Sequence, residues 1–197
     1  LGIRHISAQA VAMSDRARTE IMKLLTGEAR PTLGSDAQPG ALSAAALNAR
    51  LAPLLAEAAL SAPRTELVRA LLLLWHGHLE ASHAISQRST HADGCFLHAI
   101  MHRREPDYGN AKYWWRQVGA HPAFATIAAR VGEFLEQREE QELKQRLLPG
   151  GHWDANTFVD LCETAAQSQA QEDLLREIQR IESESLLQYL LQEGRPR

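Results

Sequence analysis

Helix-forming residues fill every long segment of this chain, and this feature constrains the fold more than any other. Ala, Leu, Glu, Gln and Arg dominate these segments, and runs of β-branched residues are missing. Apolar side chains recur at helical spacing in residues 5–26 and again in roughly 171–192. The pattern predicts an all-α protein with more than half of its residues in helices and no extended sheet.

Helix breakers divide the chain into successive helices. Residues 28–40 contain two prolines and two glycines, which predicts a loop. Asp93-Gly94 predicts a turn that closes a second loop over 88–94. The remaining predicted helices are 41–60 (broken or kinked at Pro53), 63–87 (capped by Ser61), 95–105, 110–118 (capped by Asn110), 122–147 and a helix that Asp154 caps.

The chain length favours one domain. A folded chain of 197 residues buries about 70% of the surface that its unfolded form exposes. Two stretches, 75–83 and 110–122, are similar to half of a tetratricopeptide unit, although their spacing is irregular. We therefore expect residues 1–197 to form a single-domain multi-helix bundle of α-hairpins that is locally tetratricopeptide-like.

Charge and cysteine usage limit the partners and the compartment. The net charge of −3 argues against a nucleic-acid partner, which usually requires a basic excess. The longest apolar run, residues 70–75, is too short for a membrane span, and the first residues lack a signal-peptide pattern. Two cysteines, Cys95 and Cys162, fit a reducing compartment, and Cys95 is interpreted as a small buried thiol. We expect a cytoplasmic protein, with a homodimer retained as a hypothesis.

Histidine is concentrated in one part of the chain. Six of the nine histidines lie within residues 76–102, and three of the four tryptophans lie within 75–115. Histidine ionises near neutral pH and binds metals, and indole offers a large recognition surface. The segment 62–122 is therefore predicted to form the functional site.

The same part of the chain resembles a known family. The string HAIMHRREPDYGNAKYWWRQVGAHPAF resembles the signature of an uncharacterised all-helical family of bacteria and fungi, and WxxHLExSHxIxQ, WDxxxFVDLCE and LREIQRIE resemble its lesser motifs. The resemblance covers about 70–182 and implies an all-helical fold with no established activity. It also implies a polar or acidic residue at Gly77 and a large aromatic near Ser183, where this chain differs.

Histidine and carboxylate spacing predicts a candidate metal or catalytic site. His98 and His102 are spaced i,i+4 on one helix face, and Glu105 follows on the same side. Glu80 and His83 form a Glu-x-x-His pair on the preceding helix. If the two helices pack antiparallel, His83, His98 and His102 could hold Zn or Fe. A di-iron centre would need a second Glu-x-x-His pair. The alternative is that each histidine ties helices together through a hydrogen bond.

Two consecutive arginines follow the histidines. Arg103 and Arg104 point about 100° apart on a helix, so they cannot both face one pocket. One is expected to pair with Glu105, Asp107 or a glutamate of a neighbouring helix. The other could contact an anionic ligand, because guanidinium binds carboxylate and phosphate through two hydrogen bonds. The favoured alternative is a structural salt bridge around the turn at Pro106.

Tyr108, Asn110 and Trp114 complete the predicted site. Trp114 is expected beside the histidines, because it lies four residues after Asn110, whereas Trp115 and Tyr113 are expected in the core. The sequence thus predicts a His/Arg/aromatic cleft that binds a small-molecule or peptide ligand. The alternative is an enzyme in which His98, His102 and Glu105 perform metal-assisted or acid–base chemistry.

Overall fold

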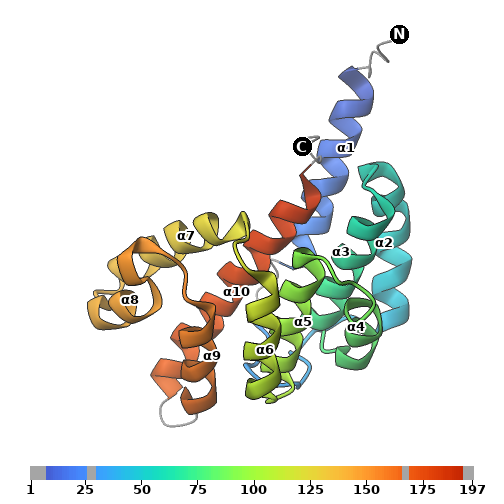
Figure 1. Cartoon of the computed structure of the whole chain (residues 1–197). Helices are drawn as coiled ribbons and strands as arrows, with labels where there is room; N and C mark the ends of the chain where they lie inside the picture. Colours follow the sequence, from blue (N-terminus) through green and yellow to red (C-terminus); the bar gives the residue numbers. More distant parts are fainter. Residues whose placement is uncertain (1–7, 26–29, 166–168, 193–197) are drawn as a thin grey trace.

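The structure, a computed structural model, describes residues 8–25, 30–165 and 169–192 (Figure 1). These residues form the helices α1 (Ala8–Lys23), α2 (Ala44–Ala58), α3 (Ala62–Trp75), α4 (Leu79–Ser86), α5 (Ala92–Arg104), α6 (Tyr108–Val118), α7 (Ala123–Gln137), α8 (Gln141–Leu147), α9 (Ala155–Thr164) and α10 (Gln169–Leu191), with a 3₁₀ turn at Pro149–Gly151. No strand occurs within these ranges. The all-α prediction is confirmed.

The long helix α10 organises the molecule. It crosses the structure from α9 at one end to α1 at the other (Figure 1) and contacts α1, α3, α7 and α9. Its buried apolar residues, such as Leu186, join fully buried side chains of the neighbouring helices in one hydrophobic cluster, among them Phe96 of α5, Ile127 of α7 and Phe158 of α9. Burial of these side chains supplies the main driving force for packing the helices together.

The predicted helix over 63–87 is two helices, because α3 ends at Trp75 and α4 begins at Leu79. Between them Gly77 has a φ of 83°, a conformation that residues with a side chain rarely adopt. A Cβ atom here would lie 2.7 Å from Ala37 of the preceding loop. Glycine thus allows both the turn and the close approach of the loop. The break also gives α4 its own direction, and its His83 meets α5.

Two other predicted boundaries are wrong. The predicted helix over 122–147 is interrupted after Gln137, where Glu139 adopts a φ of 60°, and it continues as α8. The predicted loop over 88–94 ends early, because α5 begins at Ala92 and includes Asp93 and Gly94 in its first turn. No break interrupts α2 at Pro53. Parts of the predicted elements 5–26 and 28–40, namely 5–7, 26 and 28–29, lie outside the described residues.

The cap of α6 differs from the prediction by three residues. Asp107, rather than Asn110, precedes the helix, and its carboxylate accepts a hydrogen bond from the backbone N–H of Asn110. Aspartate and asparagine are both favoured at this position, so composition alone did not separate them. Asp154 caps α9 as predicted, whereas the Ser61 side chain makes no capping hydrogen bond.

A buried ion pair fastens α5 to α10. The guanidinium of Arg103 donates to both carboxylate oxygens of Glu182, at 3.1 and 2.5 Å, and both side chains are fully buried. The neighbouring Arg104 donates to the backbone carbonyls of Gly34 and Leu74. The two adjacent arginines bind partners on different sides of α5. They therefore fix the orientation of this helix about its own axis. The remaining face of α5, which carries His98, is thereby directed toward α4.

Candidate metal centre

Three histidines from two helices meet at one place in the structure. His83 lies on α4, and His98 and His102 lie on α5. The ring centroids are 4.9 Å apart for His83 and His98, 5.4 Å for His83 and His102, and 4.7 Å for His98 and His102. One nitrogen from each ring lies within 4.8 Å of one nitrogen from each of the others. The structure therefore contains the histidine cluster that the helical spacing predicts, and we call these residues the histidine triad.

His98 is the buried centre of the triad. Its side chain is 3% exposed, and neither ring nitrogen has a hydrogen-bond partner among the described residues. The indole of Trp114 stacks on the ring, with centroids 4.0 Å apart and planes 22° apart. Burial, together with a smaller contribution from the neighbouring His102 and His83, lowers the pKa of His98 to about 4. At neutral pH this imidazole is therefore neutral, with an unused lone pair.

His102 has two polar neighbours. Its Nδ1 lies 2.9 Å from Oε2 of Glu105, and the amide nitrogen of Asn110 lies over the ring, 3.1 Å from Nε2 and 3.4 Å from Nδ1. Burial lowers the pKa of His102, and the hydrogen bond to Glu105 opposes that effect. A histidine that binds a metal through one nitrogen commonly donates its other N–H to a carboxylate, as His102 can here. Glu105 thus lies where such a supporting carboxylate is needed.

Other histidines have structural partners. The Nδ1 atom of His76 accepts a hydrogen bond from the N–H of Leu42, and Nε2 lies 3.1 Å from the carbonyl of Leu24. His121 Nε2 lies 3.0 Å from Asp93. These residues fit the alternative that a histidine ties one segment to another. His98, which makes no such bond within the described chain, does not fit it.

The three consecutive aromatic residues of α6 face different surroundings. Trp114 lies beside His98, as predicted from its position on the helix. Trp115 is buried and meets Phe96 edge-on at 4.7 Å, also as predicted. The prediction of a buried Tyr113 is wrong, because its side chain is 48% exposed. Consecutive positions on a helix point about 100° apart, so a buried Trp115 and a half-buried Trp114 leave Tyr113 toward solvent.

The two arginines of the predicted site are engaged elsewhere. Arg103 pairs with Glu182, which agrees with the option of a glutamate on a neighbouring helix, while Glu105 and Asp107 are not its partners in the described contacts. Glu182 lies 79 residues away from Arg103 in sequence, so no local spacing could identify it. Arg104 donates to two backbone carbonyls, and its contact with an anionic ligand stays a prediction.

The other predicted residues have different roles. Asp107 caps α6 and also lies within 4.8 Å of ligand atoms of His102 and Glu105. Burial raises the pKa of Tyr108, and the neighbouring Cys162 of α9 also raises it. Glu80 is exposed and belongs to neither group of metal-ligand side chains found among the described residues. The four-carboxylate pattern of a di-iron bundle is therefore not formed in this part of the chain.

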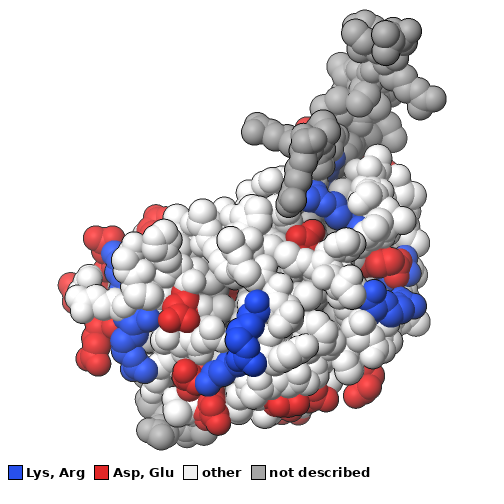
Figure 2. Space-filling view, viewed as in Figure 1, with Lys and Arg blue, Asp and Glu red and all other residues white. Residues whose placement is uncertain are grey.

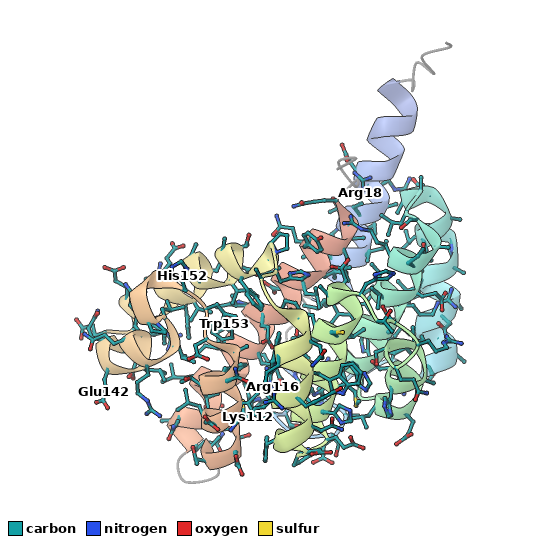
Figure 3. The ribbon with its side chains drawn as sticks, in the orientation of Figure 1. Arg18, Lys112, Arg116, Glu142, His152 and Trp153 are labelled. Atoms are coloured by element: carbon teal, nitrogen blue, oxygen red, sulfur yellow. The ribbon has the colours of Figure 1, made fainter. Side chains whose placement is uncertain are left out.

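One surface hollow adjoins the triad, and a second lies away from it. One, of about 530 Å³, is lined by Glu80 and Glu105 and so adjoins the triad through Glu105. The other, of about 820 Å³, lies between α7, α8 and the segment before α9, and Figure 3 shows His152 and Trp153 at this segment. Its walls include Phe124 of α7, and none of the predicted site residues lines it. No sequence motif indicated the larger hollow, because its lining comes from separate elements and mixes apolar residues with charged ones such as Glu133 and Lys144.

Neither the surface charge nor the comparisons with known proteins indicate a ligand for the site. Figure 2 shows acidic and basic side chains interspersed on the visible face. None of the helices in the described ranges combines the length and the apolar character that a bilayer crossing requires. Searches against protein-family models, curated proteins and solved structures find no match. The family resemblance of residues 70–182 therefore stays a prediction.

Proposed function

We propose that this protein binds one divalent transition-metal ion through His83, His98 and His102, and that the ion holds a small-molecule or peptide ligand at a remaining coordination position. The observation that carries the proposal is the state of His98. Two buried ring nitrogens without a partner are unusual in a folded protein, because buried polar groups are normally hydrogen-bonded. A metal ion is a partner that a neutral imidazole can take.

The distances support this role. A tetrahedral ion with metal–nitrogen bonds of about 2.1 Å holds two of its nitrogens about 3.4 Å apart. The ligand atoms of the triad lie within 4.8 Å of one another, so movements of about 1 Å per ring bring them to the required positions. Side-chain torsions of His83, which is only half-buried, allow such a movement.

The ligand set favours zinc or iron. Imidazole suits Zn and Fe, and three histidines leave at least one coordination position for water or another ligand. Such an ion acts as a Lewis acid and can lower the pKa of a bound water toward 7. A metal-assisted reaction at this position is the enzymatic form of the proposal. Acid–base chemistry by His98 alone is less favourable, because its lowered pKa leaves it unprotonated near neutral pH.

Metal content tests the proposal directly. The protein is purified without a polyhistidine tag, its metal is measured by mass spectrometry, and the chelator-treated form is titrated with Zn²⁺ and Fe²⁺. We expect one ion per chain for the wild type and loss of binding in His98→Ala. The matched control is His91→Ala, which removes an exposed histidine that precedes α5 outside the triad.

The His91→Ala control is compared with the wild type and with His98→Ala. His91→Ala should bind the ion as the wild type does, since its ring is not part of the triad. A wild-type protein that takes up neither ion would overturn the proposal. An equal affinity in His98→Ala and wild type would do so as well, provided that circular dichroism shows both proteins folded.

A further inference from the structure

The indole of Trp114 covers one face of the buried His98 ring. Their centroids are 4.0 Å apart and their planes 22° apart, and the ring of His102 stacks on the same imidazole at 4.7 Å. Trp114 lies on α6, whereas both histidines lie on α5, and these two helices pack directly against each other. The side chain of His98 is 3% exposed, so water has little access to the space between indole and imidazole.

An ion bound to His98 would lie within reach of the indole face. Zinc and similar ions bind imidazole in the plane of the ring at about 2.1 Å from the nitrogen, which is about 3.2 Å from the ring centre. Combined with the stacking distance of 4.0 Å, this places the ion about 5 Å from the indole centroid when the two rings face each other. Attraction between a cation and an aromatic face extends to about 6 Å. The same estimate holds for either nitrogen of His98.

Binding of an ion changes the charge on the ring that Trp114 covers. The neutral imidazole that a metal binds has no net charge, and the bound ion withdraws electrons from it, so that the ring becomes partly positive. The face of an aromatic ring is negative, and the indole of tryptophan attracts cations more strongly than the rings of tyrosine and phenylalanine. This attraction is greatest where water is excluded, as at His98. The stack is therefore stronger in the ion-bound protein than in the metal-free protein.

We infer that Trp114 makes the histidine triad selective for a doubly charged ion, because its indole face stabilises the positive charge that the ion places on His98. A singly charged ion such as Cu⁺ transfers less charge to the imidazole and gains less from the indole. Trp114 is not itself a ligand, since an indole offers a metal no lone pair. It acts on the ion through His98. This inference rests on the proposed metal-binding function.

The charge on the indole face can be changed with little change in its shape. Mono-, di- and trifluorinated tryptophans withdraw electrons from the ring and are incorporated into the full-length protein during growth. Zn²⁺ affinity of the chelator-treated protein is measured by competition with a chelating dye, and Cu⁺ affinity by an equivalent dye without oxygen. We expect Zn²⁺ affinity to fall stepwise with fluorination, by about 3- to 10-fold for the trifluorinated form. Cu⁺ affinity should fall less.

The matched control removes Trp114 alone from the fluorinated set. The chain has four tryptophans, so Trp114→Phe carries the same fluorinated residues at every other tryptophan position. Its Zn²⁺ affinity should not depend on fluorination. Without fluorine, Trp114→Phe should bind Zn²⁺ about 2- to 5-fold more weakly than wild type, and Trp114→Leu about 5- to 30-fold more weakly. Circular dichroism checks that each variant is folded, and a purely structural role of Trp114 would give no dependence on fluorine.

The outcomes separate this inference from the proposed function. Zn²⁺ binding that is independent of fluorination overturns the inference and leaves the metal site intact. An equal dependence in the Trp114→Phe background also overturns it, because the effect would then belong to another tryptophan. Equal losses for Cu⁺ and Zn²⁺ overturn the selectivity for a doubly charged ion. Failure of the unfluorinated wild type to bind any ion refutes the metal site itself.

Discussion

Lowering the pH of the metal-free protein should reveal the burial of His98 as a loss of stability. Its pKa is about 4 in the folded protein, against 6.5 for the unperturbed side chain that the unfolded chain presents. Between pH 6.5 and 4 the unfolded state therefore binds a proton that the folded state does not. The free energy of unfolding falls across this window, is unaffected by His98 above it, and levels off below it.

The size of the effect follows from the two pKa values. Their difference, 6.5 minus 4, multiplied by 1.36 kcal/mol per pKa unit, corresponds to a loss on the order of 3 kcal/mol. Such a loss is a large fraction of the stability of a typical domain. It requires that no metal ion be bound, because coordination would hold the imidazole in its neutral form and shift the window.

Urea denaturation of wild type and of His98→Phe measures this loss. Both proteins are unfolded at several values between pH 7 and 4 with a chelator present, and unfolding is followed by far-UV circular dichroism. Phenylalanine keeps a planar ring against Trp114 but does not titrate. Subtracting the two profiles removes the contribution of other groups, such as His76, whose pKa burial also lowers. Parallel profiles would show that His98 is not buried as a neutral side chain.

Two further substitutions test the scaffold. Glu182→Ala should lower the free energy of unfolding by about 3–5 kcal/mol, because it leaves the guanidinium of Arg103 buried without its carboxylate. A loss below about 1 kcal/mol in urea denaturation would contradict an ion pair shielded from water. Trp115→Ala should lower it by about 3–5 kcal/mol through the cavity it creates, while Zn²⁺ affinity of the folded variant stays unchanged; lost affinity in a stable variant would contradict a packing role.

The fold could be predicted where it depends on local sequence. Helical spacing and composition predict the helices, and Asp154 marks the start of α9 as its side chain requires. The missed breaks at Gly77 and Glu139 have a different origin. Helical composition continues through both positions, and at Gly77 the break accommodates Ala37, which lies 40 residues earlier. Tertiary contacts of this kind override a continuous helical pattern and are not visible in the local sequence.

The site could be predicted only in its local parts. The i,i+4 spacing of His98 and His102 places both rings on one face of α5. The i,i+4 spacing of Asn110 and Trp114 predicted that Trp114 lies beside them on α6, as it does. Spacing could not show that Arg103 points to Glu182, since any helix could have supplied the partner. It also could not show which histidines lack partners, because hydrogen bonding depends on the neighbours of each ring after folding.

The lack of hydrogen-bond partners at His98 has an energetic consequence for the whole molecule. Leaving a buried polar group unpaired costs about 1–3 kcal/mol, and the two nitrogens of His98 are both in this condition among the described residues. Stacking with Trp114 stabilises the folded state by about 0.5–1.5 kcal/mol, which offsets part of this cost. An apolar ring at this position would fill the same space without the penalty. The metal-free fold is therefore less stable than its packing allows. An ion bound by the triad would supply the missing partner for a lone pair and stabilise the folded state by a free energy that grows with the logarithm of the ratio of its concentration to its dissociation constant.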